Sequence, residues 1–423
     1  MQARKVGLLV VHGQGEQDRY QTLDEFTRSL VRALYNQTGE KVDLMHMRSR
    51  VDGDVDDSIR LRYSLGSVPI ELDLHEYYWA SDMSRHISFG ETIEWLIETA
   101  NGAEKFYDEN ETLAHRYEGY QKGRRWYLKH LGNALQIVYS LRNVTRFLPG
   151  SFDPLLRKMM GKYTQVCADY FGDSAIYTTS DSKSKFYEIR QTVLDGMTRK
   201  LIGLINADYD KIIIAAHSLG SVIAYDALNQ VNLEMNVNPS FAAKADKQFE
   251  LITFGSPLDK VAFFLREHLR QTDYIKQLVI KHVNGYRKKF LEMPSGNEYT
   301  VSSSVQDYLP HLRWINYWHP DDPISGHLDY YDCVDNIRLA NELPVSKQPR
   351  NPLGRLFWQF KLYGVAHTHY WSNEQIFREA INRAAANDIR KPIPADKLDQ
   401  VSGLLCQNQI LNRQAPAGQP RPH

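Results

Sequence analysis

The stretch I-I-I-A-A-H-S-L-G-S-V-I-A-Y-D-A-L, residues 212–228, decides the fold. Its first part is an apolar run typical of a strand covered on both faces, and a helix is predicted to begin directly after it. A strand that turns this tightly into a helix needs very small residues two positions before and after its centre. Ala216 and Gly220 meet that need around Ser218. The turn lifts the Ser218 side chain above the sheet edge, at the positive end of a helix dipole. We therefore interpret Ser218 as a nucleophile rather than as an ordinary helix N-cap residue.

Further strands and helices alternate on both sides of this stretch. The sequence predicts strands at 5–11, 42–48, 68–79, 211–216, 250–254 and 312–318, and a final helix at about 373–386. Such alternation indicates an α/β protein with a mainly parallel central sheet and helices on both faces. Residues 1–85 and 173–390 are predicted to form this core, 86–172 a helical cap or lid insertion, and 391–423 a C-terminal extension that is largely disordered from residue 407.

Composition sets further limits on the 423-residue chain. Lys+Arg and Asp+Glu balance at 51 each, so overall charge does not favour a nucleic-acid partner. Cys167, Cys333 and Cys406 show no C-x-x-C spacing, so we expect neither a zinc site nor a disulfide framework, and reduced thiols instead. No stretch approaches the roughly 20 apolar residues of a membrane span. We expect a cytoplasmic protein that can also sit peripherally at a membrane.

A glycine-containing segment, H-G-Q-G at residues 12–15, follows the first predicted strand. A serine becomes an effective nucleophile only when a base takes its proton and hydrogen-bond donors receive the oxyanion. Glycines at this position let the backbone approach a substrate closely. We expect the backbone N–H groups of Gly13, Gln14 and Leu219 to form the oxyanion hole.

The acid of a Ser-acid-His arrangement is expected where a late strand ends. The segment W-I-N-Y-W-H-P-D-D-P-I-S, residues 314–325, offers two adjacent aspartates there. Asp322, directly before Pro323, is favoured over Asp321, and Asp259 is a more distant alternative. The set His319, Asp321, Asp322 and His327 could suggest a metal, but it lacks a regular ligand spacing, so no metal is expected.

The base is expected after the last strand and before the last helix. The segment G-V-A-H-T-H-Y-W, residues 364–371, presents two histidines at this place. We favour His367 over His369. A third histidine, His217, precedes the nucleophile directly, and a neighbour on so tight a turn is expected to point away from Ser218.

Four local matches give a family resemblance: V-V-H-G-Q-G at 10–15, A-H-S-L-G-S at 216–221, L-I-T-F-G-S-P-L at 251–258, and W-x-N-x-W with D-P followed by H-x-x-Y-W. On these residues the chain resembles the α/β-hydrolase superfamily, within its lipase- and esterase-like branch, over about 5–85 and 175–390. The resemblance implies an α/β-hydrolase fold and a cofactor-free serine hydrolase that cleaves a carboxylic ester through an acyl-enzyme. Ala216 departs from the usual glycine, as it does in some lipases of the superfamily.

The predicted lid carries a one-sided charge. Residues 122–162 contain nine Lys/Arg and one acid, Asp153, together with apolar residues at helical spacing. Such a helix can lie on an anionic membrane, or its apolar face can pack on the core as a cap. We expect the substrate to be a lipid or hydrophobic ester. The alternatives are a non-catalytic membrane- or protein-binding module on the same scaffold, and an acyltransferase or thioesterase with the same residues.

Overall fold

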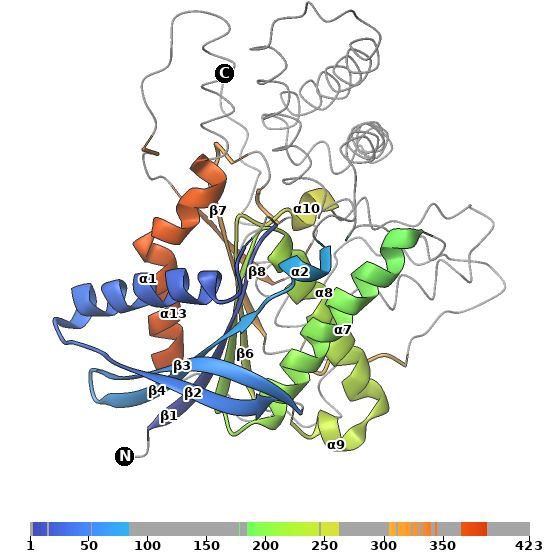
Figure 1. Ribbon diagram of the computed structural model, residues 1–423, viewed down its shortest axis with the longest axis horizontal. Coiled ribbons are helices and arrows are strands. Elements are labelled where there is room, and N and C mark those ends of the chain that lie inside the picture. Colours follow the sequence, from blue (N-terminus) through green and yellow to red (C-terminus); the bar gives the residue numbers. More distant parts are fainter. Residues whose placement is uncertain are drawn as a thin grey trace, which may run out of the picture.

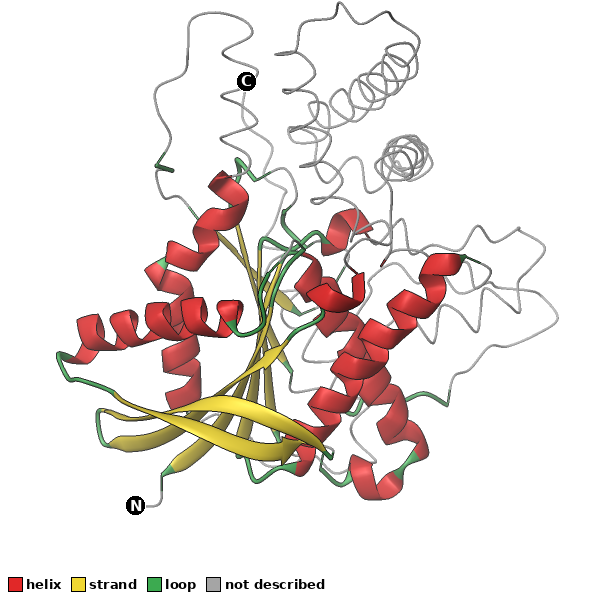
Figure 2. Cartoon of the chain, in the orientation of Figure 1, coloured by secondary structure: helices red, strands yellow, loops and turns green. Residues whose placement is uncertain are grey.

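The computed structural model describes residues 3–14, 17–51, 53–83, 177, 184–244, 247–261, 304–309, 312–322, 325–328, 331, 333–339, 343–344 and 365–386. An eight-stranded sheet in the order β2-β3-β4-β1-β5-β6-β7-β8 lies between helices (Figures 1 and 2). The predicted lid 86–172, its basic stretch 122–162 and the extension 391–423 lie outside the described residues.

The strands are β1 (Arg4–Val11), β2 (Asp43–Val51), β3 (Asp54–Leu65), β4 (Val68–Tyr77), β5 (Lys211–His217), β6 (Gln248–Phe254), β7 (Arg313–Trp318) and β8 (Val334–Arg338). The helices are α1 (Gln21–Thr38), α2 (Ala80–Met83), α7 (Lys185–Asn206), α8 (Leu219–Val237), α9 (Pro239–Ala242), α10 (Leu258–Val261), the 3-10 helix η1 (His369–Ser372) and α13 (Glu374–Ala385).

The six strands from β4 to β8 in the sheet order pair in parallel, whereas β2 and β3 form an antiparallel hairpin that continues the sheet beyond β4. The prediction of a mainly parallel α/β sheet is therefore confirmed.

Both faces of the central strand β1 are buried, which explains its lack of polar alternation. Val6, Leu8 and Val10 belong to a core shared with α1 and α13. Leu9 and Val11 point the other way, into a core shared with α7 and α8. Figure 1 shows these two helix pairs on opposite faces of the sheet.

The far end of α13 is fixed to the amino ends of two central strands. The Arg4 guanidinium donates to the carbonyl of Ala385 over 2.9 Å. The buried Lys211 ammonium donates to the carbonyl of Arg383 over 2.7 Å and to the Glu250 carboxylate over 2.8 Å. These bonds take up carbonyl groups that a helix C-terminus leaves without intrahelical donors.

One expectation about the cysteines is wrong. Cys333 is disulfide-bonded, and its partner cysteine is not among the described residues. Reduced thiols were expected from local cysteine spacing, and a bridge between cysteines far apart in sequence leaves no such signal. In the part of the chain that the structure describes, no helix combines the length and apolar character needed to cross a membrane.

Candidate functional site

The site is centred on the turn between β5 and α8. Ser218 occupies this turn with φ 50° and ψ −128°, and α8 begins at the next residue. A positive φ is uncommon for a residue with a side chain and is maintained only where the surroundings hold it. The Ser218 N–H donates to the carbonyl of Phe254 over 3.1 Å, which ties the turn to the end of β6.

Two glycines allow the turn to pack against the segment that follows β1. A Cβ atom at Gly220 would lie 2.2 Å from the carbonyl oxygen of His12, and one at Gly13 would lie 2.8 Å from the Ser218 Cβ. Both separations are impossible for real side chains. The close approach therefore requires glycine at both positions, and it brings Gly13 directly beside Ser218.

Three predicted residues meet at the carboxyl edge of the sheet. The His367 Nε2 lies 2.8 Å from the Ser218 Oγ, and the His367 Nδ1 lies 2.9 Å from the Asp322 Oδ2. Ser218 is 1% exposed, and the side chains of His367 and Asp322 are 3% and 0% exposed. This chain of hydrogen bonds can take a proton from the serine hydroxyl to the imidazole and hold the resulting cation against a buried carboxylate.

Tyr370 adds a fourth group to this chain. Its hydroxyl donates to the Asp322 Oδ2 over 2.9 Å and accepts the His319 N–H over 3.0 Å. The Ser325 hydroxyl lies 2.8 Å from the Tyr370 hydroxyl oxygen. Because the tyrosine proton is given to Asp322, Ser325 acts as the donor in this bond. Burial, together with the nearby Asp322 carboxylate, raises the pKa of Tyr370 well above its ordinary value, so the hydroxyl stays protonated as a donor. From the sequence, Tyr370 is recognised only as part of the H-x-x-Y-W motif, and Ser325 has no predicted role.

The alternative residues lie elsewhere. The Asp321 side chain is 52% exposed, and its Oδ2 is 3.9 Å from the His319 Nδ1. The His369 Nδ1 lies 3.0 Å from the Ser372 hydroxyl. Asp259 lies in the short helix α10 after β6. The fold instead brings Asp322 and His367 to Ser218.

His217 faces away from the serine hydroxyl, as expected from the tight turn. Its Nε2 donates to the backbone carbonyl of His367 over 3.0 Å. Burial lowers the pKa of His217 to about 3, and the neighbouring His367 adds to the effect. His217 is therefore a neutral ring that holds the His367 backbone rather than a base.

Two of the expected oxyanion donors, Gly13 and Leu219, adjoin Ser218. Leu219 is the first residue of α8, so its N–H has no carbonyl partner within the helix. Among the described residues no other acceptor takes the N–H of Leu219 or of Gly13. The Gln14 carbonyl accepts from the Gln17 side chain over 3.1 Å, which holds the turn after Gly13.

His12 positions this turn in a way that the sequence did not reveal. Its Nδ1 donates to the Gly13 carbonyl over 2.7 Å, and its Nε2 accepts the Trp79 N–H over 3.1 Å. Burial lowers the pKa of His12 to about 4, which keeps the ring neutral and suited to both bonds. Because a trans peptide directs its C=O and N–H to opposite sides, holding the Gly13 carbonyl also fixes the direction of the Gln14 N–H.

The W-x-N-x-W residues support the segment after Asp322. The Asn316 side-chain amide donates to the Gly326 carbonyl over 3.0 Å and to the Asn336 side chain over 2.9 Å. The Asn336 oxygen in turn accepts the Leu328 N–H over 2.9 Å. These bonds connect the middle of the strand pair β7–β8 to the 325–328 segment, which also contains Ser325.

Within the described ranges, no group of three or more His, Cys, Asp or Glu side chains is arranged to hold a metal ion. Comparison of the chain with protein-family models, with curated proteins and with solved structures finds no match.

Proposed function

We propose that the protein is a serine hydrolase of the α/β-hydrolase type that cleaves a carboxylic ester. The observation that carries the proposal is the continuous hydrogen-bond chain from the Ser218 Oγ through His367 to Asp322. The setting of Ser218 supports the proposal further, because this serine has a positive φ, directly precedes a helix and lies beside Gly13.

Acylation follows from the positions of these atoms. The Ser218 Oγ attacks the ester carbonyl while the His367 Nε2 takes its proton. The Asp322 carboxylate stabilises the imidazolium through the Nδ1–H. The amides of Gly13, Gln14 and Leu219 receive the negative charge that develops on the carbonyl oxygen. The imidazolium then gives its proton to the departing alkoxide, which leaves an acyl group on Ser218.

Deacylation repeats these steps with water. His367 takes a proton from the water as the water attacks the acyl carbonyl, and then returns it to the Ser218 oxygen. An acyltransferase or thioesterase would use the same residues with another acceptor or a thioester. Because Ser218 is 1% exposed, a substrate must displace part of the chain to reach it.

The substrate class remains part of the proposal. A lipid or hydrophobic ester is suggested by the predicted lid 86–172, and contact with an anionic membrane by the basic stretch 122–162. Flotation with neutral and anionic liposomes tests the membrane part, since charge-neutralising substitutions in 122–162 should reduce binding to anionic liposomes only.

The compartment can be tested through Cys333. The sequence favoured a cytoplasmic location, whereas the disulfide at Cys333 favours an oxidising compartment. Counting free thiols by mass spectrometry in protein isolated without reductant separates the two.

The activity itself is tested by intact-mass analysis after exposure to a fluorophosphonate. The wild type is expected to gain one adduct with loss of fluoride, and Ser218→Ala to gain none. The exposed Ser240 provides a matched control, because Ser240→Ala removes a serine hydroxyl remote from the site. An adduct that persists in Ser218→Ala contradicts the choice of nucleophile. No adduct on the wild type favours the non-catalytic binding module.

A further inference from the structure

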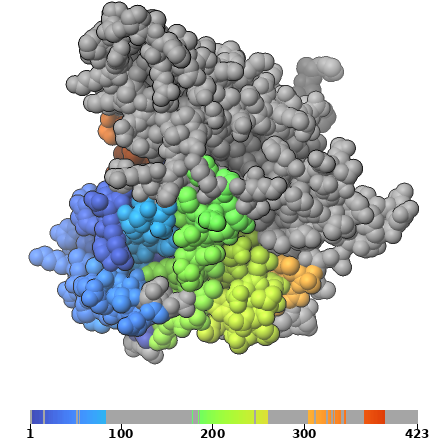
Figure 3. Space-filling model, turned by 45° about the vertical axis from the view of Figure 1, so that its right-hand side comes forward, coloured from blue at the N-terminus to red at the C-terminus, as the bar shows by residue number. Residues whose placement is uncertain are grey.

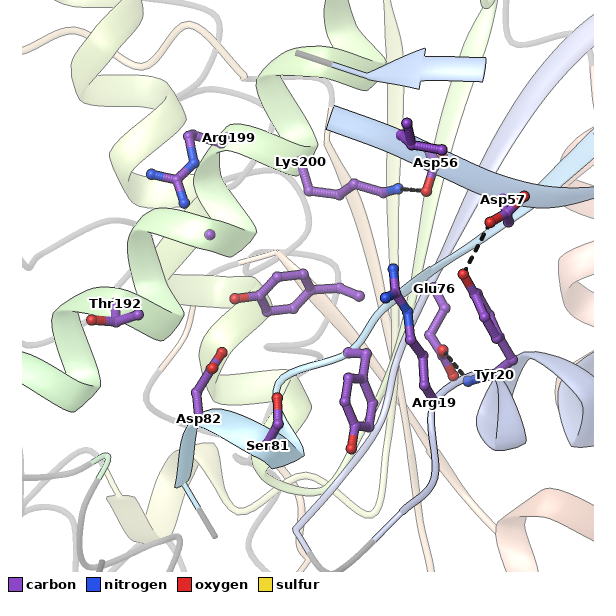
Figure 4. Close-up of a pocket in the computed structure, with 14 residues that line it drawn as sticks. Arg19, Tyr20, Asp56, Asp57, Glu76, Ser81, Asp82, Thr192, Arg199 and Lys200 are labelled. Carbon is purple, nitrogen blue, oxygen red and sulfur yellow. Dashed lines mark hydrogen bonds and ion pairs between the residues drawn. The ribbon is translucent and has the colours of Figure 1, made fainter. Parts of the chain in front are cut away.

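A cavity of about 470 Å³ lies at the carboxyl end of β4. Its walls come from the turn before α1, the start of β3, the end of β4, α2 and one side of α7. Figure 3 shows the blue N-terminal elements meeting α7, drawn in green, at the surface. Seven of the lining side chains are charged: Arg19, Asp56, Asp57, Glu76, Asp82, Arg199 and Lys200 (Figure 4).

Two of the acids in this cavity are already paired. Asp56 binds the Lys200 ammonium through one carboxylate oxygen and the His75 Nδ1, 2.6 Å away, through the other. Asp57 accepts from the Arg48 guanidinium over 2.9 Å and 3.2 Å, one bond to each oxygen. Neither carboxylate has an oxygen left without a donor.

A third acid is used by the helix start. The two Glu76 oxygens accept the backbone N–H groups of Tyr20, over 2.7 Å, and Leu23, over 3.2 Å, where α1 begins. Asp82 is exposed on α2, and burial raises its pKa. Asp82 is thus the one cavity acid whose carboxylate makes no hydrogen bond among the described residues.

The unused hydrogen-bonding capacity is mainly that of donors. Arg19 and Arg199 come from opposite walls of the cavity (Figure 4), and neither guanidinium makes a hydrogen bond within the described part of the chain. Each guanidinium offers five N–H donors and no acceptor. The Arg19 Cζ, the central carbon of the guanidinium, lies 5.1 Å from the centre of the Tyr20 ring. This stacking contact leaves the Arg19 N–H groups available. Lys200 lies near Arg19: burial lowers the pKa of Lys200, the charge of Arg19 acts in the same direction, and the charge of Asp56 acts against it.

We propose that this cavity binds an anionic group, phosphate or carboxylate, through Arg19 and Arg199, and that the group is the head group of the ester substrate. The planar guanidinium matches both anions with paired N–H donors. The assignment of the anion as the head group of the ester substrate rests on the proposed hydrolase function.

The cavity and the nucleophile share one edge of the sheet. Tyr77 ends β4 directly opposite Val11, the last residue of β1. The next residue, Tyr78, lines the cavity, and its ring centre is 5.6 Å from that of His12. His12 precedes Gly13, which lies against Ser218. An ester with its carbonyl at Ser218 must therefore pass His12, which is 1% exposed, and Tyr78 to reach the two arginines.

The test uses two matched esters and inorganic phosphate. The esters are a short-chain monoacylglycerol and its phosphate-bearing analogue, which share the acyl bond. The proteins are the full-length wild type, the double variant Arg19→Gln/Arg199→Gln, and Arg32→Gln as control. Arg32 is an exposed arginine on α1 that does not line the cavity. For the wild type we expect a higher kcat/KM with the phosphate-bearing ester. The ratio of kcat/KM between the two esters should fall at least tenfold in the double variant and stay unchanged in Arg32→Gln.

Binding of inorganic phosphate, measured by calorimetry, separates this inference from the hydrolase proposal because it needs no turnover. Phosphate binding that is lost in the double variant supports the anion site even if no ester is cleaved. Phosphate binding with an unchanged ester ratio overturns the head-group assignment and leaves a site for a free anion. No phosphate binding and an unchanged ratio overturn the whole inference, while a fluorophosphonate adduct on Ser218 would still stand.

Discussion

The Tyr370 hydroxyl and the His367 ring bind the same oxygen of Asp322: the tyrosine donates to the Oδ2 over 2.9 Å, and the histidine Nδ1 lies at an equal distance from it. Two donors therefore share one carboxylate oxygen inside a buried site. The strength of each bond depends on the other, because each donor withdraws negative charge from that oxygen.

Tyr370→Phe should lower kcat/KM about tenfold, the usual effect of losing one hydrogen bond to a charged group. Without the tyrosine, the Asp322 carboxylate loses one of the two donors that orient the oxygen facing the His367 Nδ1, so the loss should appear mainly in kcat. Tyr331→Phe is the control, because Tyr331 is buried and its hydroxyl donates to the Leu258 carbonyl over 3.4 Å, away from the triad. If both variants keep the wild-type kcat, Tyr370 has only a packing role.

Asp322→Asn should reduce kcat by about 10⁴-fold, because an amide at this position favours the wrong His367 tautomer and cannot stabilise the imidazolium. Asp321→Asn makes the same chemical change one residue away, at a side chain that is 52% exposed. Its kcat should stay within about threefold of the wild type. Steady-state hydrolysis of a chromogenic ester measures both, and equal losses in the two variants would contradict the assignment of the acid.

Gly220→Ala should destabilise the fold by about 3 kcal/mol or more, because the added methyl group would lie 2.2 Å from the His12 carbonyl oxygen and the core must shift. Urea unfolding followed by circular dichroism gives the change. Gly39→Ala serves as a comparison, since Gly39 has a positive φ but open space around it, so only backbone strain of about 1 kcal/mol is added. A similar, small loss in both variants would show that the contact between the two loops is not tight.

His217 should make the protein less stable in acid. Its pKa is about 3 in the folded state and about 6.5 when unfolded, so below pH 6.5 the unfolded chain binds a proton that the native state does not. The resulting stability is complete above pH 6.5 and falls as the pH drops towards 3. At pH 5 the loss from one such histidine is about 2 kcal/mol.

The variant His217→Gln tests this dependence, because the amide can still donate to the His367 carbonyl. The difference in unfolding free energy between pH 7.5 and pH 5 should be about 2 kcal/mol smaller than in the wild type. His327→Gln removes an exposed histidine and should keep the wild-type difference. An unchanged difference in His217→Gln would mean that this ring takes up a proton in the native state.

The sequence predicted the elements whose signals are local. The apolar runs of β1, β5 and β6 were recognised because both faces of these strands are buried. The strand β3 was missed because its charged residues, such as Arg60, lie in a hairpin where ion pairs with β4 replace apolar burial. The strand β8 was missed because V-D-N-I-R is short and polar.

The residues of the site are predictable from the sequence only in part, for a related reason. The elbow around Ser218 is encoded within a few residues, whereas the choice between Asp321 and Asp322 depends on how a turn is oriented. That orientation is set by distant partners, including Tyr370 and the Asn316 amide. The His12–Trp79 pair likewise joins residues 67 positions apart and leaves no local pattern.

The separation of Ser218 from His367, 149 positions along the chain, has a consequence for biosynthesis. A ribosome completes the nucleophile elbow and its central strands well before the histidine exists. The helix that follows the histidine is anchored by Arg4 and Lys211 only when residues 383–386 have emerged. During synthesis the turn at Ser218 therefore exists before its His367 partner, and the hydrogen-bond chain can close only after α13 docks onto β1 and β5.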